Sequence, residues 1–357
     1  MYKDIYDSFL NLVRLGIGHD SFVRILSDNW DEVYNLANQQ GLLAVVLDGI
    51  EKLPDDKRPS KEVLLNWIGE VLQSYEQRYD AYQKSMSSLA GYFSENGLKT
   101  MLIKGYACGI NWPNPKHRPC GDIDIWMFGK QEEADNLVRK EKGIKVDTSH
   151  HHHTTFEWNG FLVENHYDFV NTKDLKTSKS MEKIFKELGQ DDSNWIEVGG
   201  ERVYIPSPDL HALFLIRHLA LHFASVNVNL RQLIDWAFFV EKHTSEINWQ
   251  WLIDTLKIYH MYDFYNCVNA ICVGDLGFPV HIFPNVQFDP SLKDKVLKDI
   301  LEPEYVAEEP IEFIRRLRYK YIRWQGNAWK QNLCFGENRF GMFWMSLWAH
   351  LIKPASL

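Results

Sequence analysis

Two aspartates, Asp122 and Asp124, are separated by one residue in the apolar segment GDIDIW at residues 121–126. The alternation of residue types predicts a β-strand, in which positions i and i+2 face the same side. Both carboxylates then lie on one face, where like charges repel each other unless a cation lies between them. The strand is therefore one half of a candidate cation site.

A second segment, TTFEWNGFLVENHYDF at residues 154–169, predicts a β-hairpin, because Asn159-Gly160 is typical of a two-residue turn. The turn also fixes the register of the two strands. It pairs Trp158 with Phe161, Phe156 with Val163, Thr155 with Glu164 and His153 with His166. One face is then apolar, and the other is a candidate site. The polar face carries Glu164, His166 and Asp168 opposite Thr155, His153 and His151.

Glu164 supplies the third carboxylate that the aspartate pair lacks. Three carboxylates on neighbouring strands can hold one or two Mg²⁺ ions, or Mn²⁺, which neutralise the repulsion and bridge nucleotide phosphates to an attacking oxygen. We expect His166 to orient these carboxylates. For His153 and the rest of the histidine run at 150–153, an orienting role, metal ligation and a role as a base all stay open.

The segment LIKGYACG at residues 102–109 predicts a short strand, a turn at Lys104 and Gly105, and a helix that begins near Tyr106. The first N–H groups of that helix are candidate phosphate donors. Tyr106 is expected to close part of a nucleotide pocket. Arg118, four residues before the first aspartate, is a candidate for a charge-assisted contact to a triphosphate.

Three regions are expected to position these residues. Residues 1–95 show apolar residues at helical spacing, residues 96–205 change to the period of strands, and residues 206–357 return to helical spacing. The sequence thus predicts an α+β protein with a mixed β-sheet, flanking helices and a C-terminal helical domain. The site would lie between the sheet and the helices.

In this order, the Lys-Gly turn, Arg118, the Asp-x-Asp strand and the acidic-x-His element of FLVENHYDF resemble a bacterial group called the uncharacterised nucleotidyltransferase family. This family shares the palm of DNA polymerase β. The likeness covers about residues 85–300, and the abortive-infection nucleotidyltransferase toxins are similar to a lesser degree. The resemblance implies that Asp122, Asp124 and Glu164 bind metal, and that Lys104 and Gly105 bind phosphate.

The resemblance also implies a reaction, in which an NMP moves from an NTP to a hydroxyl acceptor and pyrophosphate leaves. The acceptor is not identified by the sequence and would be a small molecule, a protein or the end of an RNA. Tyr106 follows Gly105 where many members of the superfamily have Gly-Gly or Gly-Ser, so a serine contact to phosphate is absent. Two alternatives stay open: an inactive nucleotide-binding or regulatory protein, and a toxin-like enzyme acting on RNA or protein.

Three features of the C-terminal region have a second interpretation. Arg231 and Asp235 are four residues apart on a predicted helix, which indicates a surface pair, although Arg231 is also a candidate substrate contact. His218 and His222 have the same spacing, which permits metal binding but favours a structural or substrate-facing role. The basic segment at residues 315–323 is interpreted as a solvated helix face, with RNA binding as the alternative.

Composition limits the class of protein. The formal net charge of −9 argues against a protein that binds long stretches of nucleic acid. Five scattered cysteines favour a reducing compartment, and the N-terminal residues lack the apolar core of a signal peptide, so we expect a cytoplasmic protein. The apolar run at 341–352 is too short for a membrane span and predicts an amphipathic helix.

Overall fold

The computed structural model describes residues 2–19, 25–172, 175, 177–225, 227–284, 287–304 and 312–336. The elements up to the second strand are α1 (Tyr2–Ile17), α2 (Trp30–Gln39), α3 (Leu43–Glu51), the 3₁₀-helix η1 (Asp55–Lys57), α4 (Lys61–Val71), the π-helix η2 (Leu72–Gln77), α5 (Arg78–Glu95), β1 (Met101–Leu102), α6 (Tyr106–Gly109), the 3₁₀-helix η3 (Pro115–His117) and β2 (Ile123–Trp126). The next are α7 (Gln131–Lys142), β3 (His153–Trp158), β4 (Phe161–His166), α8 (Ser178–Leu188), β5 (Trp195–Val198) and β6 (Glu201–Tyr204). The rest are α9 (Pro208–Ser225), α10 (Leu230–His243), α11 (Trp249–Ile258), α12 (Tyr262–Gly274), the 3₁₀-helix η4 (Val280–Ile282), α13 (Pro290–Leu301), α14 (Phe313–Gly326) and α15 (Ala328–Phe335).

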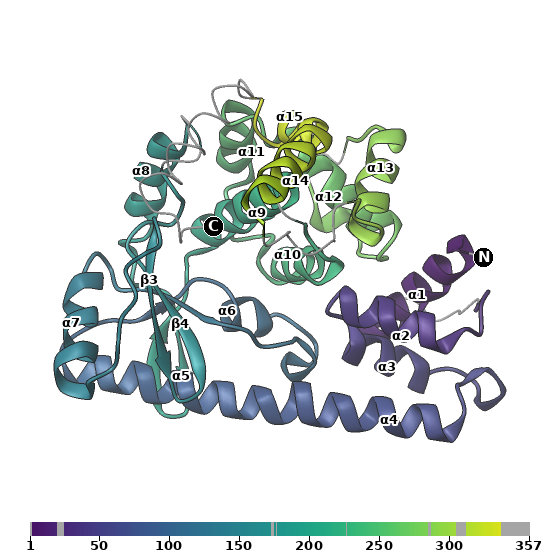
Figure 1. Ribbon diagram of the computed structural model, residues 1–357, viewed down its shortest axis with the longest axis horizontal. Helices are drawn as coiled ribbons and strands as arrows, with labels where there is room; N and C mark the ends of the chain where they lie inside the picture. The colour runs from purple at the N-terminus through teal and green to yellow at the C-terminus, as the bar shows by residue number, and fades with distance from the viewer. Residues whose placement is uncertain are drawn as a thin grey trace.

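The six strands form one mixed sheet in the order β3-β4-β2-β1-β6-β5. The pairs β2–β4 and β1–β6 are parallel, and the other neighbouring pairs are antiparallel. Helices flank this sheet, and the described chain after β6 is helical (Figure 1). The predicted α+β class with a helical C-terminal region is confirmed.

The hairpin of β3 and β4 has the register that the sequence predicts. Its turn residues, Asn159 and Gly160, have φ values of 48° and 80°. Positive φ at both turn residues is the requirement of the type I′ turn that joins two-residue hairpins. The strand partners are Trp158 with Phe161, Phe156 with Val163, Thr155 with Glu164 and His153 with His166.

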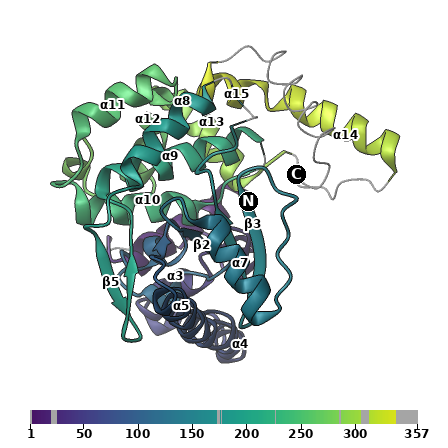
Figure 2. The same ribbon diagram turned by 90° about the vertical axis from the view of Figure 1, so that its left-hand side faces the viewer.

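One face of the sheet packs on α5 and α7, and this packing decides which way the aspartates point. Ile123 and Ile125 are fully buried in the core that these helices share with the sheet. Asp124, which lies between them, must face the opposite side, because neighbours on a strand alternate. That side faces α9 and α10, which lie above the sheet in Figure 2.

The helices α4 and α5 are continuous through η2 and form the long helix at the base of Figure 1. The helices α1–α3 lie over one end of this long helix and the sheet lies over the other. A second core joins residues of α1–α4 to residues of α9–α13. The predicted domain limits at residues 95 and 205 stay predictions.

Within the described ranges, no helix combines the length and the apolar character needed to span a membrane. The apolar run at residues 341–352, for which the sequence predicts an amphipathic helix, lies outside these ranges.

Candidate functional site

Strands β2 and β4 bring two of the predicted carboxylates together. Asp124 is the direct partner of Glu164 in the parallel pair β2–β4, so both side chains leave the sheet on the same face. Asp124 is buried, with 1% of its surface exposed, while Asp122 and Glu164 are half-buried. The hairpin register therefore places Glu164 beside the aspartate strand.

Lys104 is a positively charged residue that lies beside these carboxylates. The strand neighbour Ile103 donates its N–H to the Asp124 carbonyl at 3.1 Å, and Lys104 follows it with Nζ 2.7 Å from Asp124 Oδ1. Burial alone would lower the pKa of Lys104, but the negative charges of Asp124, Asp122 and Glu164 outweigh burial and raise it. The ammonium group is therefore charged at neutral pH.

Gly105 makes the turn after Lys104 with a φ of +58°. A Cβ atom at this position would lie 2.8 Å from the hydroxyl oxygen of Tyr82, which donates to the Asp122 carbonyl at 2.8 Å. Only glycine fits this close approach. The helix that follows, α6, has a single turn, and its N–H groups at Ala107, Cys108 and Gly109 already donate to the carbonyls of Lys104 and Gly105. The predicted row of phosphate donors is thus mostly used within the turn.

His166 lies between the two paired carboxylates. Its Nε2 atom is 3.3 Å from Asp124 Oδ1 and 3.4 Å from Glu164 Oε2. Burial acts to raise the pKa of Glu164, but the hydrogen bond from His166 and the charge of Lys104 lower it. The structure therefore brings His166 within reach of both carboxylates, and its orienting role stays a prediction. His153 lies farther away, with Nε2 3.9 Å from Glu164 Oε1.

The donor atoms of this group fit a divalent cation. Asp124 Oδ2 is buried and has no hydrogen-bond partner within the described part of the chain. Ligand atoms of Asp124, Glu164 and His166 all lie within 4.8 Å of one another. Burial and the charge of Asp124 raise the pKa of Asp122 to about 6, against the opposing charge of Lys104. Three carboxylates beside one lysine leave negative charge that a metal ion would neutralise.

A cavity of about 140 Å³ opens beside these carboxylates, between the sheet and α9 and α10. It is lined by Lys104, Gly105, Cys108, Arg118, Gly121, Asp122, Asp124, Leu215, His218, Leu219, Arg231, Gln232 and Asp235. The predicted position between the sheet and the helices therefore holds a pocket. His218 faces the pocket, and its ring lies 4.3 Å from that of His222.

The sequence indicates that Arg231 pairs with Asp235 and that Arg118 contacts phosphate, but in the structure Arg118 is the arginine that pairs with Asp235. The guanidinium of Arg118 forms a bidentate pair with Asp235, with Nε to Oδ1 at 2.7 Å and NH2 to Oδ2 at 2.9 Å. Asp235 also accepts the indole N–H of Trp112 at 2.8 Å. Among the described residues, no ion pair joins Arg231 to a carboxylate, so the helix pair of Arg231 with Asp235 is not formed. Of these two arginines, Arg231 is thus the one without an ion pair to a described carboxylate.

Tyr106 is not brought to the pocket. It is 7% exposed, its ring stacks on Tyr79 with centroids 5.9 Å apart, and its hydroxyl accepts a hydrogen bond from Gln83 at 2.9 Å. Tyr79 and Gln83 belong to α5, so Tyr106 lies in the core between α5 and the sheet. The first residue of a one-turn helix thus points into the core, and the expected closure of the pocket by Tyr106 is not seen.

The sequence does not predict two residues of the pocket, Asp235 and Gln232. The helix spacing indicates a surface pair for Asp235, yet this residue is 4% exposed and binds Arg118. The sequence does contain a signal for this role. Asp235 is a lone acidic residue in the apolar run LIDWAFF, and a buried charge needs a partner of opposite charge. Gln232, one turn before it on the same helix, lines the cavity as well.

The basic helix α14 exposes Arg315, Arg316 and Arg318, as expected of a solvated helix face.

Comparison with known proteins first assigns the chain to a class, the nucleotidyltransferases. The matching sequence profile is that of the uncharacterised nucleotidyltransferase family, over residues 27–272, and the chain belongs to this family. The resemblance seen in the motifs is confirmed. The match begins well before residue 85, so it includes most of the N-terminal helical region. The general activity that the family name gives is nucleotidyl transfer.

Other comparisons add little. No curated protein matches the sequence at a significant level. A solved structure described as that of an antigenic nucleotidyltransferase-like protein from Paracoccidioides brasiliensis is similar to 46% of this chain and 77% of its own, with 13% sequence identity and a TM-score of 0.34.

Proposed function

We propose that this protein transfers a nucleoside monophosphate from an NTP to a hydroxyl acceptor, with release of pyrophosphate, and that it requires Mg²⁺ or Mn²⁺. The observation that carries this proposal is the buried Oδ2 atom of Asp124, which has no hydrogen-bond partner among the described residues and lies in a group of three carboxylates. A buried carboxylate oxygen without a partner is costly, and a hard cation is the ligand that suits it.

Asp122, Asp124 and Glu164 would hold the ion, and His166 would keep Asp124 and Glu164 in place by hydrogen bonds. When bound, Mg²⁺ supplies positive charge that stabilises the phosphate oxygens during an in-line displacement. The rest of the site is built from the chain's own cations.

Lys104 and Arg231 line the cavity from opposite sides, the end of β1 and helix α10, and would bind the phosphates. Arg118 is held by Asp235 and would contribute charge rather than a free guanidinium. An acceptor hydroxyl would lose its proton to a base such as Glu164 and attack the α-phosphorus, a new O–P bond would form, and the bond to the departing pyrophosphate would break.

A second candidate is nucleotide binding without transfer, and one observation favours it. Lys104 Nζ lies 2.7 Å from Asp124 Oδ1, so a cation from the chain already partly neutralises the carboxylates. In such a regulatory protein, the Lys104 ammonium group would take the place of a metal ion beside the carboxylates.

Pyrophosphate release separates the two candidates. The full chain is incubated with Mg²⁺, each of the four NTPs and a panel of hydroxyl acceptors, and Asp124→Asn is compared with Asp56→Asn, a change at an exposed residue. Transfer predicts release that falls by about 100-fold or more in Asp124→Asn, because several kcal/mol of charge stabilisation are lost. The Asp56→Asn variant should match the unmodified protein. Calorimetric NTP binding without release for any acceptor would favour the second candidate.

A further inference from the structure

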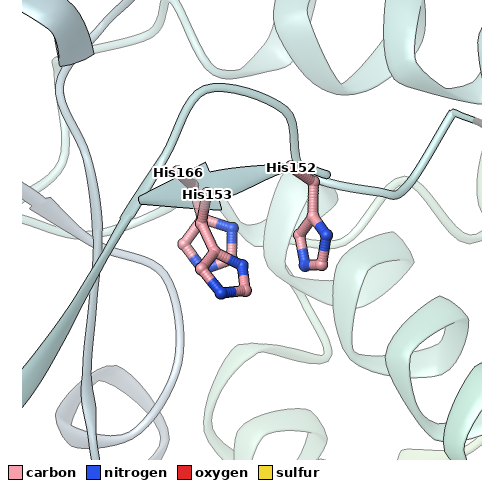
Figure 3. Close-up of side chains that lie close together, drawn as sticks. All are labelled: His152, His153 and His166. Atoms are coloured by element: carbon pink, nitrogen blue, oxygen red, sulfur yellow. The ribbon is translucent and has the colours of Figure 1, made fainter. Parts of the chain in front are cut away.

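Three histidine rings meet beside the carboxylates, at the start of β3 and the end of β4. The nitrogens that His152, His153 and His166 offer all lie within 4.8 Å of one another. Figure 3 shows the three rings on the same side of the hairpin. His153 and His166 are direct strand partners, so the hairpin register itself brings their rings together.

These rings have nitrogen atoms that no protein group uses. Nδ1 of His152 and Nδ1 of His153 are both buried, and within the described ranges neither has a hydrogen-bond partner. His153 is 6% exposed and His166 is 3% exposed. Each buried polar atom without a partner costs about 1–3 kcal/mol, so two of them in one cluster point to a ligand.

The three rings also pack against one another. The rings of His152 and His153 meet edge to face, at 88° and 4.4 Å between centroids, and His166 is tilted to both. Edge-to-face and tilted packing is a favoured arrangement of aromatic rings, and it also lets the nitrogens of the three rings approach one ion from different sides.

The charge around the cluster favours a cation. Glu164 lies 3.9 Å from His153, and the three nearby carboxylates outnumber the single charge of Lys104.

We propose that His152, His153 and His166 form a second metal site, which binds a divalent transition ion of the zinc class. Imidazole nitrogens suit zinc and its neighbours, whereas Mg²⁺ prefers the oxygens of the carboxylate group. Three protein ligands leave a fourth position open to water or to a substrate group. His152 is the half-buried member of the set and leaves a path to solvent.

The two metal sites are coupled, because His166 belongs to both groups. Zinc on the histidines competes with the hydrogen bonds that His166 gives to Asp124 and Glu164, and it also repels a second cation. Zinc therefore weakens Mg²⁺ binding, and Mg²⁺ weakens zinc binding by the same factor, as thermodynamic linkage requires.

The test uses the full chain, loaded with Zn²⁺ and dialysed against metal-free buffer, with the bound zinc measured per chain. We expect one tightly bound zinc, and a visible absorption band of four-coordinate geometry when Co²⁺ replaces it. His152→Asn and His153→Asn should each weaken zinc binding by more than the roughly 10- to 100-fold that loss of an outer hydrogen-bond partner costs. His281→Asn, at an exposed histidine of η4, is the matched control and should bind zinc normally.

Circular dichroism shows whether each variant is folded. His152 is half-buried, so we expect His152→Asn to disturb the fold less than His153→Asn does. Asp122→Asn keeps all three histidines and should bind zinc even if transfer is lost, which separates this proposal from the proposed reaction. Zinc binding that is absent from the unmodified chain, or unchanged in both folded histidine variants, would overturn the proposal.

Discussion

Lys104 supplies one positive charge to a group of three carboxylates, and this imbalance is the central feature of the site. The ammonium group lies 2.7 Å from Asp124 Oδ1, and the other oxygen of that carboxylate is buried without a partner in the described structure. Removing charges from water without full compensation is costly. The arrangement therefore favours a further cation, as the proposed metal site requires.

Arg231 gives the first prediction. Its guanidinium lines the cavity on α10 and forms no ion pair with a described carboxylate, so it is free to bind triphosphate. Arg231→Met should weaken NTP binding by about 10- to 100-fold, because a hydrogen bond to a charged group contributes roughly 1.5–3 kcal/mol. Calorimetry with a non-hydrolysable NTP measures this change. Arg315→Met, at an exposed arginine of α14, is the control, and equal affinities of the two variants would contradict the assignment.

Some residues of the pocket could be predicted from the sequence, and others could not. Asp122, Asp124 and Lys104 stand out because charges in apolar strands are rare, and the structure brings them to one cavity. The partner of Arg118 was not found, because the helix spacing of Arg231 and Asp235 offered a local pair. Tertiary packing overrides that local preference, because Arg118 and Asp235 are both buried and pair with each other.

The hairpin shows which elements are predictable. Asn159-Gly160 and the alternation on either side depend only on neighbouring residues, so the register followed directly from the sequence. The one-turn length of α6 could not be predicted from neighbouring residues in this way. Its end depends on contacts with distant segments, such as the hydrogen bond from Lys242 to the Ile110 carbonyl.

The turn at Gly105 gives a prediction for an element. Gly105→Ala should lower the free energy of unfolding by about 1–2 kcal/mol for the positive φ, and further for the clash with the Tyr82 hydroxyl 2.8 Å away. Gly129→Ala is a matched control, because Gly129 has a φ of +84° but open space around it. Urea denaturation measures both. An equal loss in the two variants would show that Tyr82 does not crowd this turn.

The whole molecule is needed to place α10. Gln40, at the end of α2, accepts the N–H of Leu230 at 2.9 Å and donates to the Ile300 carbonyl at 3.0 Å. The next residue, Gly41, has a φ of +66° and approaches the side chain of Arg231. The N-terminal helices thus support the side of the pocket opposite the sheet, which agrees with a family match that begins at residue 27. Such long-range contacts have no local signal in the sequence.

The buried pair of Arg118 with Asp235 joins the sheet region to α10 and gives a prediction for the whole fold. Asp235→Ala should cost about 3–5 kcal/mol of stability, because it leaves a buried guanidinium without a partner. The double change Arg118→Met with Asp235→Leu should recover most of this loss. Asp55→Ala, at the surface pair with Arg58, is the control and should cost less than about 1 kcal/mol. A cost of this small size for Asp235→Ala would contradict the role of the pair.

We infer that Asp122, Asp124 and Glu164 bind the metal ion of a nucleotidyl transfer. The most direct test is anomalous scattering from crystals of the full chain grown with Mn²⁺ and a non-hydrolysable NTP. We expect a manganese peak contacted by Asp122, Asp124 and Glu164, with phosphate oxygens on its open side, and no such peak in Asp124→Asn. Nucleotide bound in the cavity with Lys104 still on Asp124 and no manganese at the carboxylates would contradict it.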